Sequence, residues 1–222
     1  KINVISSSMV YENTNSFPTK EGDQFKIPPP LSTYGFQKLS TEYFAKGAYE
    51  QYNLPYTIIR PFNCIGVGEK RALSDKDILS GNIKLALSHV VPDLVQKVLK
   101  NQYPLRILGD GKQIRHYTYG GDLAEGIRIC IESDKAINND FNLSTDKSTT
   151  VLELSKIIWN KINPNKEFVY ESDPPYKNDV VKRVPDTSKA KKLLKFEAKT
   201  DLGFALDEII PWIKNQISEG NI

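Results

Sequence analysis

A tyrosine and a lysine four residues apart, Tyr34 and Lys38, form the pair whose spacing most directly indicates proton-transfer chemistry. On a helix, residues four positions apart lie on one face, so the lysine ammonium would lie beside the phenol. A neighbouring positive charge favours the phenolate form of a tyrosine, and such a pair can act as a general base near neutral pH. The same spacing also occurs in ordinary helices, so taken alone the pair leaves a structural role open.

Three consecutive serines, Ser6 to Ser8, follow the first apolar run of the chain and could supply a catalytic hydroxyl. Serines at this place also serve simply as the polar end of a strand. A catalytic role is favoured only when the serines and the Tyr/Lys pair are considered together and in their order along the chain.

The elements that must position these residues follow the order strand, helix, strand. The run 2–5 predicts a short buried strand, and 34–52 predicts a helix with Ser32 or Thr33 as its N-cap. The run 56–60 predicts a second strand, which Pro61 ends. A strand–helix–strand order is typical of a parallel sheet.

The rest of the chain predicts a mixed α/β protein. Helices are expected at 92–100, at 123–133 with Asp122 as a possible cap, at 151–162, and at 202–217, where Pro211 should kink or divide the helix. Strands are expected at 105–108 and 141–143, with an extended stretch at 116–119 and a loop from 64 to 88. Gly109 and Gly111 predict a turn with positive φ angles.

Composition excludes several classes of protein. The 30 Lys and Arg residues against 27 Asp and Glu give a net charge of only +3, which argues against a nucleic-acid-binding surface. No apolar run approaches the length of a membrane span. Two cysteines and two histidines cannot by themselves supply the ligands of a usual zinc site, so no metal is expected. The composition predicts a reduced, cytoplasmic protein.

Six sequence blocks follow one another along nearly the whole chain. They are Ser-Ser-Ser-Met-Val-Tyr at 6–11, Ser-Thr-Tyr-Gly-Phe-Gln-Lys at 32–38 with Glu42, the Arg-Pro-Phe-Asn block at 60–69, the block at 109–122 that contains Arg115, Phe-Asn-Leu-Ser at 141–144, and the block at 179–190. In this order they resemble the extended short-chain dehydrogenase/reductase family of nucleotide-sugar epimerases and dehydratases, with UDP-glucose 4-epimerase-like enzymes among its members.

The resemblance implies catalytic and cofactor-binding roles for residues of the first three blocks. Tyr34 would take the sugar hydroxyl proton as hydride leaves for NAD, while Lys38 would favour the phenolate and hold the nicotinamide ribose. Ser7 would hydrogen-bond the reacting oxygen. Ser6 and Pro61 are further cofactor-binding candidates on the same ground.

The resemblance also implies a nucleotide-sugar site, with a UDP-sugar as the expected substrate class. Ser8 and Asn63 would contact the substrate, and Arg115 would bind its diphosphate, a task suited to a planar, permanently charged group. Arg183 or Lys177 would assist Arg115. An ordinary surface charge remains the alternative reading of Arg115 and Arg183.

Departures from the family pattern narrow the reaction. Similar 4,6-dehydratases carry Asp and Glu at the positions of Ser8 and Met9. At the position of Met9, decarboxylating relatives carry Glu and fucose-synthase relatives carry Cys. A simple epimerisation, commonly at C4, needs only the Tyr/Lys/Ser set and is therefore favoured. We expect Cys64 to be a buried packing residue and His116 to be a packing or hydrogen-bonding substitution, while the effect of Glu12 is open.

No Gly-x-x-Gly-x-x-Gly or Gly-x-Gly-x-x-Gly occurs in the 222 residues, although the family carries this phosphate-binding turn after its first strand. We therefore expect an N-terminally incomplete chain, inactive by itself. Its expected fold is a partial, doubly wound Rossmann sheet, at 1–65 and 120–145, and a smaller α/β nucleotide-sugar-binding domain, at 66–119 and 146–222. A dehydratase or reductase of the same family, or a nucleotide-sugar-binding module without activity, remain alternatives. A homodimer is expected by analogy.

Overall fold

A computed structural model of the chain describes residues 1–69, 79–80, 83–84, 89–175 and 180–222. The chain divides into two compact units, each built from separate stretches of sequence. The first contains residues 1–64, 114–148 and 180–202, and the second contains 65–113, 149–179 and 203–222. The first unit thus includes 114–119, 146–148 and 180–202, which the sequence-based division assigned to the substrate domain. The cofactor and substrate roles of the two predicted domains stay predictions.

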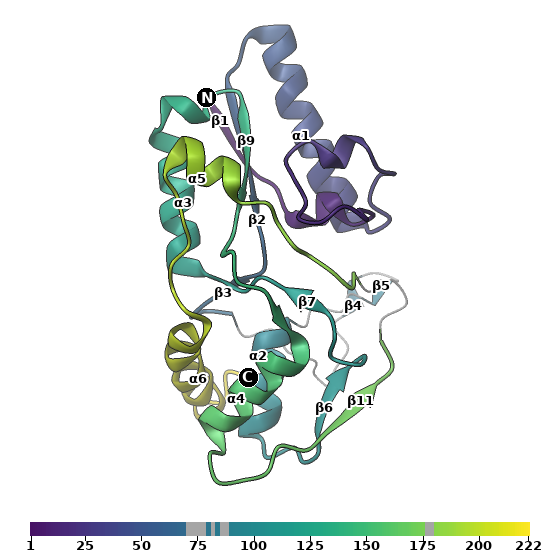
Figure 1. The fold of residues 1–222 in the computed structure, drawn as a ribbon, viewed down its shortest axis with the longest axis vertical. Helices are drawn as coiled ribbons and strands as arrows, with labels where there is room; N and C mark the ends of the chain where they lie inside the picture. The colour runs from purple at the N-terminus through teal and green to yellow at the C-terminus, as the bar shows by residue number, and fades with distance from the viewer. Residues whose placement is uncertain (70–78, 81–82, 85–88, 176–179) are drawn as a thin grey trace. The chain divides into compact units, whose positions relative to one another are not determined.

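A parallel three-stranded sheet forms the centre of the first unit (Figure 1). Its strands are β1 (Ile2–Ile5), β2 (Tyr56–Pro61) and β9 (Asn139–Leu143), in the order β1-β2-β9. The predicted strands at 2–5 and 56–60 are confirmed. Because neighbouring strands run in the same direction, their carboxyl ends meet at one edge of the sheet, where ligands of such folds bind.

Helices cover both faces of this sheet. On one face lies α1 (Thr33–Tyr52), where Ala45 packs against Val4 and Ile58 of the strands. On the other face lie α3 (Gly120–Glu132) and α5 (Ser188–Leu194) (Figure 1). Side chains alternate along a strand, so Ile59 joins the core on the α3 and α5 face while Ile58 joins the core beneath α1. These layers confirm the doubly wound arrangement.

Short elements complete the first unit. They are the 3-10 helices η1 (Ser8–Tyr11), η2 (Asp23–Phe25) and η3 (Asp134–Ala136) and the two-residue strands β7 (Ile114–Arg115) and β8 (Thr118–Tyr119). Strand β3 (Cys64–Ile65) lies at the division between the units.

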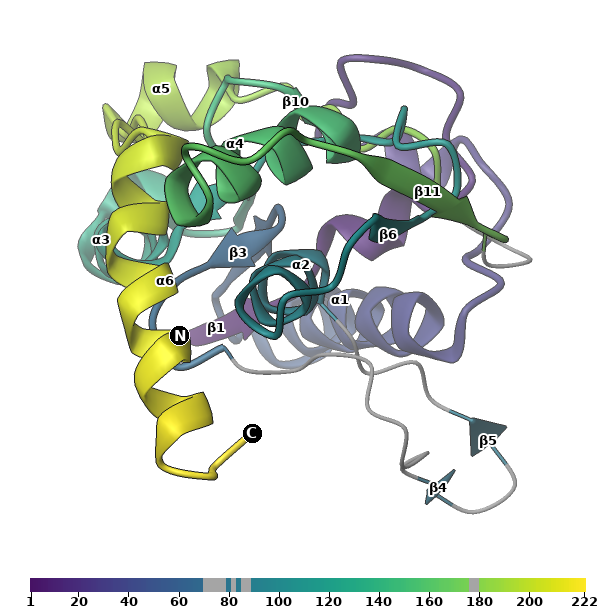
Figure 2. The same ribbon diagram turned by 90° about the horizontal axis from the view of Figure 1, so that it is seen from below.

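The second unit is built on two helices and a pair of parallel strands. Helix α2 (Val90–Leu99) packs against α4 (Val151–Ile162) and β6 (Leu105–Leu108). Strand β6 pairs in parallel with β11 (Tyr170–Asp173), and the two lie side by side in Figure 2. The unit also contains α6 (Leu202–Ser218), β10 (Thr149–Thr150) and a hairpin of β4 (Leu79–Ser80) and β5 (Ile83–Lys84). It has the mixed α/β composition that the sequence predicts.

Several local predictions can be compared directly. Ser32 caps α1 through Gly35, as expected, and Gly109 and Gly111 have positive φ angles of 70° and 75°. One expectation was wrong. Asp122 does not cap its helix, because α3 already begins at Gly120 and the Asp122 carboxylate accepts the backbone N–H of Thr200. Of the two outcomes expected for Pro211, division of the helix does not occur, since α6 continues from 202 to 218; a kink there stays a prediction.

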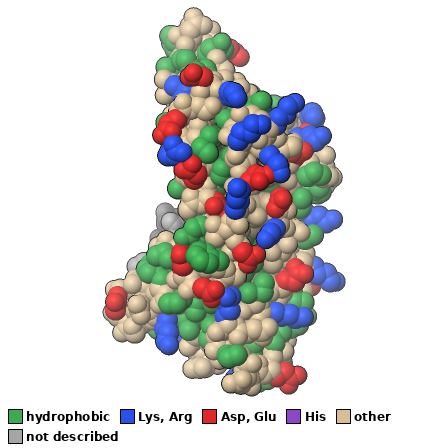
Figure 3. Space-filling model, turned by 60° about the vertical axis from the view of Figure 1, so that its left-hand side comes forward, with side chains coloured by type: hydrophobic (Ala, Val, Ile, Leu, Met, Phe, Trp, Pro, Cys, Tyr) green, Lys and Arg blue, Asp and Glu red, His purple; other side chains and the backbone are tan. Residues whose placement is uncertain are grey.

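No helix in the described part of the chain is long and apolar enough to cross a membrane. The same residues contain no group of three or more His, Cys, Asp and Glu side chains that could hold a metal ion. On the face drawn in Figure 3, basic and acidic side chains are interspersed rather than separated into patches of one sign.

Candidate active site

The predicted Tyr/Lys pair lies in the first turns of α1. The Tyr34 side chain is 52% exposed, and the Lys38 Nζ lies 5.7 Å from the centre of its ring. Lys38 also donates a hydrogen bond of 2.8 Å to the backbone carbonyl of Ile5, the last residue of β1. The ammonium is therefore held beside the phenol at the carboxyl end of the sheet, where the proposed chemistry requires it.

The serine triplet follows β1 directly, and all three serines are buried. Ser7 caps η1, since its Oγ accepts the backbone N–H of Met9 at 3.2 Å. That bond uses a lone pair, so the hydroxyl proton of Ser7 remains available for another acceptor. Ser6 instead donates its hydroxyl proton to Glu42 on α1. The two serines therefore differ in what their hydroxyl groups can do. Ser7 can still donate its proton to a ligand, whereas Ser6 already donates its proton to Glu42 inside the protein.

A glycine lets α1 approach the serine segment closely. A Cβ atom added at Gly35 would lie 2.8 Å from the carbonyl oxygen of Met9 and 2.7 Å from Cβ of Pro30. Tyr34 precedes this contact and Ser7 lies two residues before Met9. The absence of a side chain at position 35 therefore sets how near the Tyr/Lys helix lies to η1, a role that the sequence analysis missed.

Glu12, whose role the sequence left open, fixes the start of the same helix. Its carboxylate accepts the backbone N–H of Ser32 at 3.2 Å and also the Ser32 hydroxyl proton. The Ser32 Oγ in turn accepts the N–H of Gly35 at 3.0 Å. The substitution that departs from the family pattern thus adds a second residue to the N-cap of α1, immediately before Tyr34.

Pro61 and Asn63 lie where β2 ends. Pro61 is the last residue of the strand, opposite Leu143 of β9. Asn63 has a φ of 36°, in the left-handed region that asparagine tolerates better than most residues. Its carbonyl accepts the N–H of Thr118, while its buried Nδ2 has no hydrogen-bond partner. Buried donors are nearly always hydrogen-bonded, so an unpaired amide here is consistent with a residue that donates to a bound ligand.

The predicted diphosphate-binding arginines lie on adjacent segments of the first unit. Ile114 forms a bridge with Lys182, so Arg115 and Arg183 follow it on neighbouring stretches of chain. Arg115 is buried and donates to the carbonyls of Ile114 and Val181 at 2.9 and 3.2 Å. Burial raises the pKa of Tyr117, and the nearby charges of both arginines oppose that rise. The charges of Arg115, which is buried, and of Arg183, which is half-buried, therefore both act on one phenol. Lys177 lies outside the described residues.

A small cavity brings predicted substrate residues together. It is lined by Ser8 and Arg183, with Glu12, Lys182 and Phe62 among the other lining residues. The cavity also includes the Glu12 carboxylate and holds only about 10 Å³, about the room of one water molecule, so it brings Ser8 and Arg183 together without by itself accommodating a phosphate.

Two other residues singled out from the sequence had different outcomes. Cys64 is exposed, so the expectation of a buried packing residue was wrong; the next residue of β3, Ile65, is the buried one. His116 is a hydrogen-bonding core residue, as expected. Its Nδ1 lies 2.9 Å from the carbonyl of Thr145, and burial lowers its pKa.

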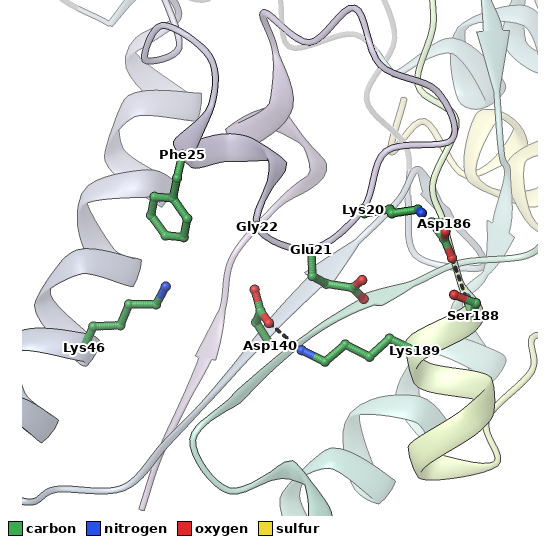
Figure 4. A pocket seen from close by; sticks show the side chains of 9 residues that line it. All are labelled: Lys20, Glu21, Gly22, Phe25, Lys46, Asp140, Asp186, Ser188 and Lys189. Atoms are coloured by element: carbon green, nitrogen blue, oxygen red, sulfur yellow. Dashed lines mark hydrogen bonds and ion pairs between the residues drawn. The ribbon is translucent and has the colours of Figure 1, made fainter.

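A second hollow, of about 440 Å³, lies beside β9 and contains none of the predicted site residues (Figure 4). Its charged groups largely satisfy one another. Asp140 accepts from Lys189 at 2.7 Å, and Asp186 accepts the N–H of Ser188 at 2.8 Å. Lys46 lies 4.1 Å from the ring centre of Phe25.

Comparison with known proteins defines the family. The sequence model of the NAD dependent epimerase/dehydratase family matches residues 1–144. The chain therefore belongs to that family, and the resemblance drawn from its motifs is confirmed.

The relatives include enzymes of more than one reaction. The chain is 30% identical to a proposed UDP-glucose 4-epimerase of Methanocaldococcus jannaschii, over 95% of this chain and 61% of that protein. It is 29% identical to UDP-glucuronic acid decarboxylase 1 of Arabidopsis thaliana, over 96% of this chain and 45% of that protein. The crystal structure of UDP-glucose 4-epimerase with UDP-glucose from Thermotoga maritima superposes with a TM-score of 0.78 at 29% identity, covering 97% of this chain and 63% of that one. The chain thus spans at most about two-thirds of these proteins.

Proposed function

We propose that the protein is an NAD-dependent nucleotide-sugar epimerase that inverts C4 of a UDP-hexose. The observation that carries the proposal is the placement of Tyr34 and Lys38 beside the Ser7 segment at the carboxyl end of the parallel sheet. These are the groups that a reversible alcohol oxidation needs: a base for the hydroxyl proton, a cation that stabilises the phenolate, and a hydrogen bond to the reacting oxygen.

The residues of this chain would act in the following order. Tyr34 accepts the proton of the sugar hydroxyl as its carbon loses hydride, which leaves a ketone whose oxygen Ser7 hydrogen-bonds. Lys38, whose Nζ lies 5.7 Å from the centre of the Tyr34 ring, would stabilise the negative charge on the phenolate oxygen. After the keto sugar has turned over, Tyr34 returns the proton as hydride comes back to the opposite face, so the net reaction is an isomerisation with no net oxidation. NAD, when bound, supplies the hydride acceptor and donor.

The residues present fit the nicotinamide end of NAD. Lys38 reaches the end of β1, and Pro61 lies at the adjacent end of β2. The 222 residues contain no glycine-rich phosphate-binding turn. We therefore expect this stretch alone to bind NAD too weakly for turnover. Isothermal titration should show no NAD binding at micromolar concentration, and micromolar affinity would contradict this expectation.

The substrate diphosphate would be held by Arg115 and Arg183, which converge beside Tyr117. Asn63, with its unpaired buried amide, and Ser8, in the cavity that Arg183 lines, would contact the rest of the nucleotide sugar. Lys177 remains a candidate from the sequence. Uridine is the proposed base because the family resemblance implies it and because the similar proteins include enzymes of UDP-glucose and UDP-glucuronic acid.

A decarboxylase or dehydratase of the same family is the second candidate, favoured by the similarity to the plant decarboxylase. Those reactions need a further acid or base directly after the catalytic serine, Ser7. Ser8 and Met9 occupy these places, and neither can act as such a base at neutral pH. The epimerase is therefore the proposal that the residues support better.

The test is to incubate the full-length enzyme with NAD and a panel of UDP-sugars and to follow product stereochemistry by NMR. We expect an equilibrium mixture of two UDP-hexose epimers with no loss of water or CO₂. Release of CO₂ from UDP-glucuronic acid, or formation of a stable 6-deoxy-4-keto sugar, would refute the proposal in favour of the second candidate.

Two coarser expectations accompany this function. A homodimer is consistent with the exposure of Tyr43, Phe44 and Tyr52 on α1, and sedimentation of the full-length protein would test it. A place in the reducing cytoplasm is consistent with the lack of a disulfide between Cys64 and Cys130.

A further inference from the structure

Glu42 is a wholly buried carboxylate on the helix that carries Tyr34 and Lys38. It follows Lys38 by one helical turn. A buried carboxylate is costly unless its oxygens are hydrogen-bonded or paired with a cation. The hydrogen-bond partners of Glu42 therefore show which segments the buried carboxylate connects.

Those partners come from three separate segments of the first unit. Oε1 accepts the hydroxyl proton of Ser6 and the Nε–H of Arg60 at 2.8 Å. Oε2 accepts from Nη2 of Arg60 at 2.7 Å and from Nε2 of Gln24 at 3.5 Å. The carboxylate thus joins α1 to the residue after β1, to the end of β2 and to the loop of η2.

Arg60, the cationic partner of Glu42, also pairs with a second carboxylate. Arg60 is fully buried, and its Nη1 donates to Asp140 at 2.8 Å, which also accepts from Lys189. Burial works against the charged guanidinium, but the hydrogen bonds to Glu42 and the surrounding negative charges hold the pKa of Arg60 above its usual value. Arg60 therefore stays charged and forms a bidentate pair with Glu42, which leaves the carboxylate little rotational freedom.

Ser6 links this buried pair to the reacting groups. It immediately precedes Ser7, whose Oγ caps η1. Lys38, one turn before Glu42, is bound to the carbonyl of Ile5, which immediately precedes Ser6. The turn from Ile5 to Ser7 is therefore held to α1 at two successive points, one through Lys38 and one through Glu42.

We propose that Glu42 is a positioning residue for the epimerisation: held by Arg60 and bonded to Ser6, it sets the place of the Ser7 hydroxyl relative to Tyr34 and Lys38 on the same helix. The proposal rests on the proposed function. It also gives Ser6 an inward role, acting through Glu42, in place of the predicted direct contact with NAD. Displacement of a reacting group by about 1 Å can cost about 100-fold in rate, and this is the scale of effect expected.

The test uses the full-length enzyme and three variants. Glu42→Gln keeps the shape of the side chain and removes its charge, Ser6→Ala removes only the hydroxyl, and Glu50→Gln is the matched control. Glu50 is an exposed glutamate two turns further along α1. For each, kcat and KM for the UDP-sugar, the affinity for NAD, and Tm are measured.

We expect kcat to fall about 100-fold in Glu42→Gln and about 10-fold in Ser6→Ala, with KM and NAD affinity within about threefold of wild type. The double variant should be no slower than Glu42→Gln alone, because the two residues act as one unit. Glu50→Gln should behave as wild type.

The outcomes separate the proposal from the function on which it rests. An inactive wild-type enzyme refutes the proposed function. An active wild type with unchanged kcat in Glu42→Gln or Ser6→Ala overturns the positioning role, as does a Ser6→Ala variant that loses NAD affinity while keeping kcat. If Glu42→Gln does not fold, Ser6→Ala decides the question by itself.

Discussion

Two glycines of α1 allow the effect of helix propensity to be separated from the effect of steric crowding against the serine segment. Gly35 and Gly47 both lie in α1, but only Gly35 is crowded. A Cβ atom at position 47 would meet nothing within 4 Å, whereas at position 35 it would meet a backbone oxygen and a proline carbon at under 3.0 Å. Neither of those atoms can move aside without shifting the backbone.

The magnitudes follow from these two environments. Replacing a helical glycine by alanine stabilises a helix by roughly 0.5–1 kcal/mol. Overpacking at a rigid contact costs about 1–3 kcal/mol, which only Gly35→Ala incurs. The free energy of unfolding should therefore differ between the two variants by about 1–3 kcal/mol, or roughly 2–12 °C in Tm for a protein of this size.

The assay is thermal unfolding of both variants, combined with turnover of the full-length enzyme on its UDP-sugar. Gly47→Ala should be at least as stable as wild type and fully active. Gly35→Ala should be less stable than Gly47→Ala and should lose turnover, because α1 must move away from η1 and take Tyr34 with it. Equal stability and equal turnover of the two variants would refute the reasoning.

Three further predictions concern the N-cap of α1, a buried histidine and the diphosphate site. Glu12→Ala removes the hydrogen bonds from Ser32 and should lower the free energy of unfolding by about 1–3 kcal/mol in urea titrations; the exposed Glu50→Ala is its control, and equal losses would contradict the role of Glu12. Burial lowers the pKa of His116, so the unfolded chain binds a proton more readily and stability should fall as pH drops below about 6.5, by at most about 1.4 kcal/mol per pH unit; His116→Gln should flatten that dependence between pH 7.5 and 5.5, and an unchanged profile would show that other groups cause it. Arg115→Lys should raise KM for the UDP-sugar by about tenfold or more while the affinity for free NAD stays unchanged, because lysine cannot form the planar two-pronged contact; an unchanged KM would leave Arg115 with a structural role only.

Local signals in the sequence were sufficient for much of the fold. The run 2–5 and the stretch 151–162 matched a strand and a helix of the structure at both ends. Ser32 was recognisable as an N-cap because its side chain needs only the backbone three residues later. The neighbourhood of Tyr34 and Lys38 was predictable for the same reason, since both belong to one helix.

The contacts that the sequence could not reveal join distant segments. Glu42 and Arg60 are 18 residues apart, and Arg60 and Asp140 are 80 apart. Neither separation has a period that indicates a contact. The burial of a polar side chain depends on such partners, and Cys64 shows the converse, since a small apolar side chain was expected inside and lies exposed. The close approach at Gly35 was also hidden, because a single glycine in a helix does not say what lies opposite.

The central claim is that Tyr34 is the base of an epimerase, and the most direct measurement is the turnover of Tyr34→Phe in the full-length enzyme. Loss of the phenol should reduce kcat by about 100-fold to 10,000-fold, the range for removal of a positioned general base. The dissociation constant for the UDP-sugar should stay within about threefold of wild type, since the diphosphate is held elsewhere. Turnover close to that of wild type would contradict the account.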